Sequence, residues 1–253
     1  MKVRQLEIEN FRGVRAGKVV FADNTLLVGG NNVGKSTVCE ALDLVLGPER
    51  TSRRPVVDEH DFHRSTYVDA DKKPVPIIIR AVVVDLPDEA RRRFGGHLRR
   101  WNDTDRSFVD DLENGAEQAD DEGVTWALQV SFRARYDAVE DDFEADTFFE
   151  HPLPELDELD DDEASSLGEG RDRFTRAHKR LCGFVYLRAL RTGSRALGLQ
   201  RGSLLDTVLR LSEEGSAEMW METLRQMALH DRPTALDRVA GVILISPDLD
   251  LDL

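Results

Sequence analysis

The chain begins with alternating hydrophobic and polar side chains over residues 3–10 (VRQLEIEN). A period of two residues is typical of a strand with one buried face. Residues 18–21 predict a second strand and the apolar residues 26–28 a third, with turns at residues 10–14 and at Asp23-Asn24. The start of the chain therefore predicts three short strands before any helix.

The hydrophobic spacing changes to that of a helix after the third strand. Apolar residues recur every three or four positions, at Val38, Ala41, Leu42, Val45 and Leu46. This interval places them on one helical face, and Gly47 is typical of a helix end. The pattern predicts an amphipathic helix directly after the glycine-rich residues 29–34.

Later segments predict further strands. Residues 76–85 are almost continuously apolar and rich in β-branched residues, which predicts a strand buried on both faces. Residues 124–136 alternate strictly, and residues 143–149 follow them across a short polar turn. These two strands predict an antiparallel β-lobe beside the core.

Further helices are also expected. Pro87 opens a helix to about Trp101, with acids first and arginines last, as the helix dipole favours. A helix is predicted over residues 173–181, followed by a short buried strand at 184–187. The C-terminal helices are predicted at residues 204–211 and 217–229.

Composition limits the class of protein. The chain has 253 residues, 40% of them hydrophobic, which is enough for one large domain with a real core. It has no apolar run of the roughly 18 residues that a membrane span needs. Two cysteines, Cys39 and Cys182, make no disulfide framework, so a reducing cytoplasm is expected.

The charge is strongly acidic. A formal net charge of −15 argues against a broadly basic nucleic-acid-binding surface. Arginines at 91–93 and 99–100 are compatible with a local basic patch, although a solvated helix face is the simpler interpretation. The acidic segments 102–123 and 150–172 predict exposed loops. Mimicry of nucleic acid by residues 150–172 is a less favoured alternative.

Residues 29–36 (GGNNVGKS) match the phosphate-loop pattern G-x-x-x-x-G-K-[ST] at every fixed position. Gly29 and Gly34 allow a tight turn close to a phosphate, and the loop amides then form an anion nest at the start of the helix. Lys35 is predicted to reach the β- and γ-phosphates, Ser36 to bind Mg²⁺, and Thr37 to contact phosphate oxygens. The predicted ligands of ATP and Mg²⁺ are Gly29, Gly30, Asn31, Asn32, Val33, Gly34, Lys35, Ser36 and Thr37.

The residues around this loop resemble a particular group of ATPases. Residues 6–13 (LEIENFRG) followed by 28–37 (VGGNNVGKST) are similar to the start of the ABC-type heads of the RecF, SMC and OLD (overcoming lysogenisation defect) group. Residues 46–50 and 58–63 (DEHDFH), with 186–191 and 201–205, narrow the resemblance to OLD-family ATP-dependent endonucleases. The resemblance covers residues 1–212, and only the phosphate loop within it is strongly specific.

The resemblance implies a fold and further site residues. The expected fold class is α/β: a P-loop NTPase with an ABC-head-like mixed sheet, an antiparallel β-lobe and C-terminal helices. Residues 1–232 are expected to form a partial ATPase domain and 233–253 a tail. Arg12 is implied as a nucleotide-binding residue, and Asp61 is a candidate catalytic residue near Mg²⁺ and the attacking water. A polar loop is the simpler interpretation of residues 58–63, whose spacing fits no zinc motif.

Several parts of such an ATPase are not found in the sequence. Residues 242–248 have the apolar run of a Walker B strand, but Ser246-Pro247 stand where its acids belong. No LSGGQ-like segment and no Toprim nuclease segment is recognised. The chain is therefore expected to be the front part of an ATPase head, to hydrolyse ATP poorly, and not to cut DNA.

Three functions remain open. The favoured one is an ATP-binding OLD-like module whose complete family couples ATP hydrolysis to DNA cleavage. The alternatives are a RecF/SMC-type DNA-repair head and a non-catalytic interaction module. The expected partners are ATP, DNA in an assembled form, and a second copy or partner chain that supplies the missing parts, with no membrane.

Overall fold

The computed structural model describes residues 1–31, 33–48, 56–109, 123–154 and 166–186. The chain divides into two compact units, residues 1–184 with 243–253, and residues 185–242. Only Val185 and Tyr186 of the second unit are described, so the fold below is that of the first unit. Within the described ranges, no helix has the length and apolar character needed to cross a membrane.

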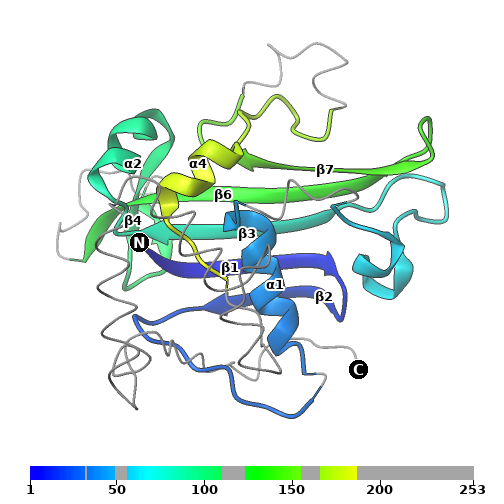
Figure 1. Cartoon of the computed structure of the whole chain (residues 1–253), viewed down its shortest axis with the longest axis horizontal. Helices are drawn as coiled ribbons and strands as arrows, with labels where there is room; N and C mark the ends of the chain where they lie inside the picture. The colour runs from blue at the N-terminus through cyan, green and yellow to red at the C-terminus, as the bar shows by residue number, and fades with distance from the viewer. Residues whose placement is uncertain (32, 49–55, 110–122, 155–165, 187–253) are drawn as a thin grey trace, which may run out of the picture. The chain divides into compact units, whose positions relative to one another are not determined.

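The first unit is built on a seven-stranded sheet in the order β2-β1-β3-β6-β4-β5, with β7 also paired to β6 (Figure 1). The strands are β1 (Lys2–Phe11), β2 (Val14–Val20), β3 (Ile77–Val84), β4 (Leu98–Asn102), β5 (Ser107–Phe108), β6 (Val124–Asp137) and β7 (Asp142–Phe149). Every pairing among these described strands is antiparallel. The long β6 is shared: its first part pairs with β4 and its second part with β7.

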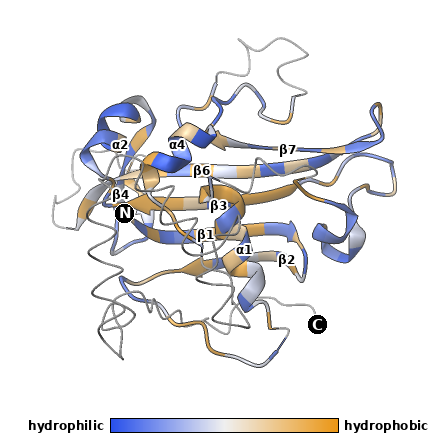
Figure 2. Ribbon diagram, in the orientation of Figure 1, coloured by the Kyte–Doolittle hydropathy of each residue, from blue (hydrophilic) through white to orange (hydrophobic). Residues whose placement is uncertain are grey.

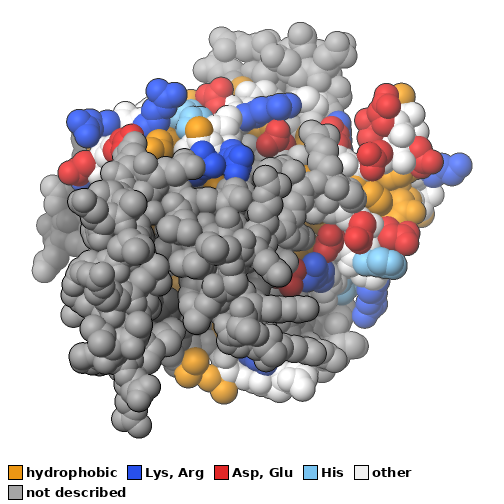
Figure 3. Space-filling model, in the orientation of Figure 1, with side chains coloured by type: hydrophobic (Ala, Val, Ile, Leu, Met, Phe, Trp, Pro, Cys, Tyr) orange, Lys and Arg blue, Asp and Glu red, His pale blue; other side chains and the backbone are white. Residues whose placement is uncertain are grey.

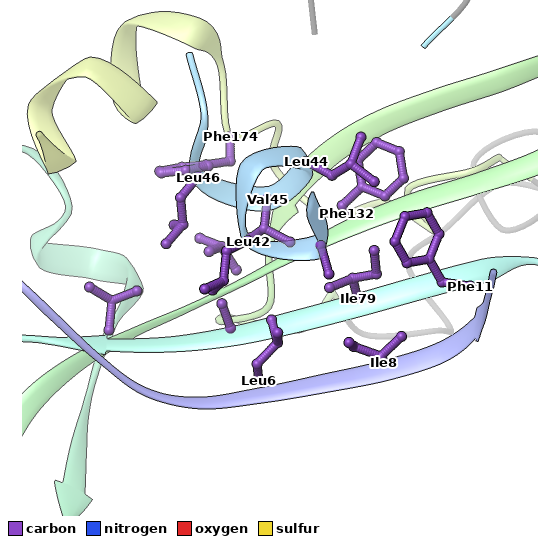
Figure 4. Packing of buried hydrophobic residues seen from close by; sticks show 14 of the residues in the cluster. Leu6, Ile8, Phe11, Leu42, Leu44, Val45, Leu46, Ile79, Phe132 and Phe174 are labelled. Atoms are coloured by element: carbon purple, nitrogen blue, oxygen red, sulfur yellow. The ribbon is translucent and has the colours of Figure 1, made fainter. Parts of the chain in front are cut away.

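Helix α1 (Lys35–Leu46) packs on one face of this sheet, against β1, β3 and β6. Its buried side chains are those that the helical spacing predicted, together with Leu44. Leu42, Leu44 and Val45 belong to one core cluster with Ile8, Ile79 and Phe132 from the strands (Figure 4). Burial of this apolar face therefore holds the helix, and the loop before it, against the sheet.

The strand β3 is buried on both faces, as its continuous apolar pattern predicted. Val83 belongs to the core beneath α1. Its neighbours Val82 and Val84 point to the other face, because side chains alternate along a strand. There they form a second cluster with Trp101, Phe108 and Ala127. Figure 2 shows the hydrophobic residues running along the central strands.

Two short helices, α2 (Asp88–Arg93) and α4 (Arg176–Cys182), pack against each other at one end of the sheet. The ring of Phe94 directly after α2 lies 5.9 Å from Phe174 and 5.7 Å from His178, between ring centroids. α4 confirms the helix that the sequence predicted over 173–181.

The predicted helix over 87–101 is wrong in its second half. Helix α2 ends at Arg93, just before Gly95-Gly96, and residues 98–102 form the strand β4. Gly95 and Gly96 weaken the helix, and β6 offers residues 98–102 a complete strand partner. The predicted loop 102–123 likewise contains β5, whose Phe108 is buried against Trp101, while residues 110–122 lie outside the described residues.

The predicted strands at 26–28 and 184–187 are also wrong in the described residues. Residues 26–28 and 184–186 have no regular structure, and the side chains of Leu26 and Val28 are 43% and 62% exposed. Among the described strands, none pairs with residues 26–28 or 184–186. The sheet is also not mixed among the described strands, because every pairing there is antiparallel.

The predicted exposed loop 150–172 is part of the packed structure at both ends. Glu150 is buried, accepts a hydrogen bond from Ser131 Oγ and forms an ion pair with Arg133. Arg171 and Glu169 extend this network of charges. Residues 155–165, the helices at 204–211 and 217–229 and the tail 233–253 lie outside the described residues.

Candidate functional site

The glycine-rich segment leads directly into the first turn of α1. Gly34 is the residue before the helix and has φ 85°, a left-handed backbone conformation that residues other than glycine rarely adopt. A Cβ on Gly29 would lie 2.7 Å from Val33 Cγ2. The backbone of this loop therefore requires glycine at position 34, and a side chain at position 29 would force Val33 to move.

The electrostatics at the start of α1 favour an anion. No acidic residue lies in its first turn, and none occurs in residues 29–37. The backbone amides of a first helical turn have no partner within the helix, and they carry the positive end of the helix dipole. Gly29, Gly30, Asn31 and Ser36 are exposed, so this positive end faces solvent.

The side chain of Lys35 folds back over its own loop. Its Nζ donates a hydrogen bond to the Gly29 carbonyl at 2.8 Å and another to the Gly30 carbonyl. The ammonium therefore stands where the loop carbonyls converge, and an incoming anion would exchange these carbonyls for its own oxygens. Ser36 and Thr37 carry the hydroxyls predicted to contact Mg²⁺ and phosphate, while Asn32 lies outside the described residues.

Arg12 and Asp61 are separated by 49 residues in the sequence, and the structure brings them together. Arg12 Nε donates to Asp61 Oδ1 at 2.9 Å, and the Arg12 backbone amide donates to the Asp61 carbonyl at 2.7 Å. The guanidinium also pairs with Glu40 of α1. Glu40 lies four residues after Ser36, so the two share a face of the helix. Arg12 thereby links the β1–β2 turn, α1 and the segment around Asp61.

Asp61 uses both carboxylate oxygens within the protein. Oδ1 accepts from Arg12, and Oδ2 accepts from the Asp58 amide at 3.3 Å. The Asp58 side chain in turn accepts from the His60 amide, which completes a capping box around the short 3₁₀ helix Glu59–Asp61. With only 7% of the residue exposed, Asp61 is placed to hold Arg12. Its predicted role beside an attacking water stays a prediction.

The histidines of this segment lie apart from any metal-binding arrangement. His63 is buried and its Nδ1 lies 2.8 Å from the Arg12 carbonyl, whereas His60 is exposed. Across the described part of the chain, no group of three His, Cys, Asp or Glu side chains is arranged to hold a metal. Two 3₁₀ turns, Glu59–Asp61 and His63–Ser65, flank Phe62, which is buried in the core.

Sequence reasoning missed two residues that support the site. Asn10 Nδ2 donates to the carbonyls of Thr66 and Val75, both at 3.1 Å, and so fastens the segment after Asp61 to the end of β1. Lys179 of α4 donates to the Leu44 carbonyl in the last turn of α1. Burial lowers the pKa of Lys179 to about 7. Asn10 stands within the NFRG motif, whereas no sequence signal marks Lys179.

The comparisons with known proteins concern the same part of the chain. A family model described as an AAA ATPase domain matches residues 1–159. No curated protein matches the chain. The match includes β1, Arg12, the glycine-rich loop, α1 and the Asp61 segment.

Two solved structures resemble the chain at low identity. A crystal structure of the SmcHead bound to the C-winged helix domain of ScpA is 16% identical with a TM-score of 0.31, covering 59% of this chain and 35% of that chain. A structure described as the structural biochemistry of ATP-driven dimerization and DNA-stimulated activation of SMC ATPases is 13% identical with a TM-score of 0.38, covering 85% of this chain and 100% of that chain. Both TM-scores lie below 0.5, so neither likeness carries weight for function.

The family match confirms the fold class that the sequence predicted, a P-loop NTPase α/β fold, here with an antiparallel sheet. The matched residues make up more than half of the chain and hold the complete phosphate-loop motif in front of α1. The chain therefore belongs to the AAA ATPase domain family.

Proposed function

We propose that the chain binds ATP with Mg²⁺ at the start of α1, through residues 29–37. The observation that carries the proposal is the exposed, acid-free first turn of α1, with the Lys35 ammonium held over the loop by the Gly29 and Gly30 carbonyls. Phosphate oxygens are stronger partners for an ammonium than neutral carbonyls, because both groups of the new hydrogen bond are charged. Lys35 is thus held close to its predicted ligand.

The residues present fit both parts of the ligand. The amides of the loop and first turn, with Lys35 and Thr37, suit the phosphates, and the exposed Ser36 hydroxyl suits a hard cation such as Mg²⁺. When bound, Mg²⁺ neutralises charge on the phosphates. The chain's own residues orient the phosphate chain and hold it against the positive end of α1.

Arg12 is proposed to extend this site. Its guanidinium pairs with Glu40, on the face of α1 that also carries Ser36, and is held from the other side by Asp61. Two carboxylates fix the position of the guanidinium, and a fixed guanidinium is suited to a phosphate. In this proposal Asp61 is a positioning residue that acts through Arg12.

The proposed place of the chain among ATPases is an OLD-like module, supported by the resemblance of residues 6–13, 28–37 and 58–63. Because Ser246-Pro247 replace the Walker B acids, we expect slow hydrolysis by this chain alone, and a second copy or partner chain would supply the missing groups. In an assembled form, ATP turnover would gate an action on DNA. A RecF/SMC-type repair head shares the same site and is the second candidate.

Isothermal titration calorimetry with ATP and Mg²⁺ tests the proposal. Lys35→Ala should lower the ATP affinity at least tenfold without unfolding the protein. The matched control is Lys18→Ala, which removes the same charge from an exposed residue that pairs with Glu7 on the opposite sheet face. Equal ATP affinity of wild type and Lys35→Ala would contradict the proposal. No ATP binding by either protein would contradict it too and would favour a non-catalytic interaction module.

A further inference from the structure

Arg12 has an unusual backbone conformation for a residue other than glycine. Its φ is 51°, in the left-handed region, although a glycine, Gly13, directly follows it. A residue with a side chain loses free energy in this region, so the conformation persists only where neighbouring groups hold it. Other parts of the protein must therefore hold the Arg12 backbone in place.

Both polar groups of the Arg12 main chain contact the segment 61–63. The Arg12 amide donates a hydrogen bond to the Asp61 carbonyl at 2.7 Å. The Arg12 carbonyl lies 2.8 Å from His63 Nδ1. A carbonyl oxygen can only accept, so the hydrogen of this bond is on His63 Nδ1 and the imidazole is the donor. Residues on both sides of Phe62 thus hold the backbone of Arg12.

The position of His63 is itself fixed by the surrounding structure. Phe11 and Phe62 form an isolated antiparallel bridge, and they are 0% and 1% exposed. After His63, the Thr66 amide donates to the His63 carbonyl at 3.0 Å, and Asn10 Nδ2 donates to the Thr66 carbonyl. His63 is 8% exposed. The imidazole therefore occupies a fixed position at the border of the core.

The two histidines of this segment lie in different environments. The His60 side chain is 80% exposed, and its Nε2 lies 3.6 Å from Glu59 Oε1. Figure 3 shows histidine among acidic side chains at the right of the view, where the cyan turns of this segment lie in Figure 1. His63 is instead buried and contacts Arg12. His60 thus offers a matched control within the same segment.

The direction of the Arg12 side chain depends on its backbone. Arg12 Nε donates to Asp61 Oδ1 at 2.9 Å, and the guanidinium also pairs with Glu40 of α1. The rotamers that a side chain can adopt are limited by the φ and ψ of its own residue. A change of the Arg12 backbone out of the left-handed region would therefore point the guanidinium away from α1.

We propose that His63 is a positioning residue for Arg12. Its Nδ1–H holds the Arg12 carbonyl, and with it the left-handed backbone from which the guanidinium reaches the face of α1 that carries Ser36. The proposal rests on the proposed function, in which Arg12 extends the phosphate site. His63 acts only through Arg12 and does not contact the nucleotide.

NMR of the nucleotide-free protein tests whether His63 positions Arg12. The Arg12 Nε–H is hydrogen-bonded to Asp61 and should exchange with solvent more slowly than the Nε–H of the exposed Arg15. Arg12→Ala identifies the signal. His63→Leu and His63→Phe both remove the donor and should speed the exchange several-fold. His63→Asn keeps a donor near the Nδ1 position and should restore slow exchange, and the control His60→Leu should leave it unchanged.

Titration with ATP and Mg²⁺ tests the consequence for binding in a double-mutant cycle. Arg12→Ala and His63→Leu should each weaken ATP binding several-fold, by similar factors. If His63 acts through Arg12, the double variant should bind ATP within about twofold of Arg12→Ala alone. His63→Asn and His60→Leu should bind ATP as the wild type does. A residue that only stabilised the fold would give no such rescue and no such coupling to Arg12.

Two outcomes would overturn the proposal. The first is an unchanged exchange rate of the Arg12 Nε–H in both His63→Leu and His63→Phe. The second is a loss of ATP affinity from His63→Leu that is equally large with and without Arg12, because His63 would then act on the fold as a whole. Absence of ATP binding by the wild type would contradict the proposed function, and the exchange of the Arg12 Nε–H would still decide whether His63 positions Arg12.

Discussion

The ammonium of Lys179 in α4 lies 2.8 Å from the backbone carbonyl of Leu44 in the last turn of α1, a contact between residues 135 positions apart. α1 has no basic residue of its own in that turn. A cation at the carboxyl end of a helix interacts favourably with the helix dipole. Lys179 therefore stabilises the end of the phosphate-loop helix from a distant segment of the chain, although burial disfavours the charged form of its side chain.

Because Lys179 is buried, we expect the free energy of unfolding to depend on pH. Its pKa is about 7 in the folded protein and 10.5 for a free lysine side chain. Between these values the unfolded chain binds more protons than the folded one, so the free energy of unfolding rises with pH through this window. Below pH about 7, Lys179 is protonated in both the folded and the unfolded state, so its contribution to the free energy of unfolding no longer changes with pH.

Lys179→Met should remove this slope. We expect the difference in unfolding free energy between wild type and variant to change by up to about 1.4 kcal/mol per pH unit between about pH 7.5 and 9.5. Urea unfolding at three pH values measures it, and Lys18→Met, at an exposed site, is the control. Parallel curves for wild type and Lys179→Met would show that the buried ammonium does not titrate in this window.

Asp61→Ala should destabilise the protein and weaken ATP binding together. The change leaves the half-buried Arg12 without one of its two carboxylate partners and opens the capping box, which should cost about 1–3 kcal/mol. Glu59→Ala removes an exposed acid from the same 3₁₀ turn and should cost less than about 0.5 kcal/mol. Chemical unfolding and ATP titration measure both effects. A variant Asp61→Asn that keeps stability and ATP affinity but loses hydrolysis would instead assign Asp61 to catalysis.

The isolated chain should hydrolyse ATP more slowly than about 1 s⁻¹, at the low end of ordinary enzyme rates. The phosphate loop binds and orients, but acids that place Mg²⁺ and water are not recognised in the sequence. Phosphate release by the purified chain, with Lys35→Ala as background, measures the rate. Faster turnover that Asp248→Asn abolishes would identify Asp248 as a Walker B acid.

The chain is not expected to cut DNA. Cleavage by two metal ions needs carboxylates that hold the ions ~4 Å apart on a rigid scaffold, and the acidic residues 157–163 lie in a segment with no apolar periodicity. Supercoiled plasmid incubated with Mg²⁺ or Mn²⁺ should stay intact. Nicking that survives purification and disappears when Asp157, Asp160 and Asp161 are changed to Asn would make this segment catalytic.

Local patterns in the sequence were enough to predict the elements whose partners lie close in the chain. The alternation of residues 124–136 predicted β6 and its hairpin with β7, because strict period two leaves one choice of buried face. The helical spacing from Val38 to Leu46 and the motif at 29–36 predicted α1 and the loop before it. In each case the residues that form the pattern lie within about 25 positions of one another.

Only the tertiary structure decided the elements that depend on distant partners. Residues 98–102 have the composition of a helix end and become a strand because β6 stands beside them. Residues 26–28 have the composition of a strand and form none where no described strand accepts their hydrogen bonds. The pairs Arg12–Asp61 and Lys179–Leu44 depend on how the sheet and helices pack. A single polar residue forms no periodic pattern, so its partner cannot be predicted from the sequence.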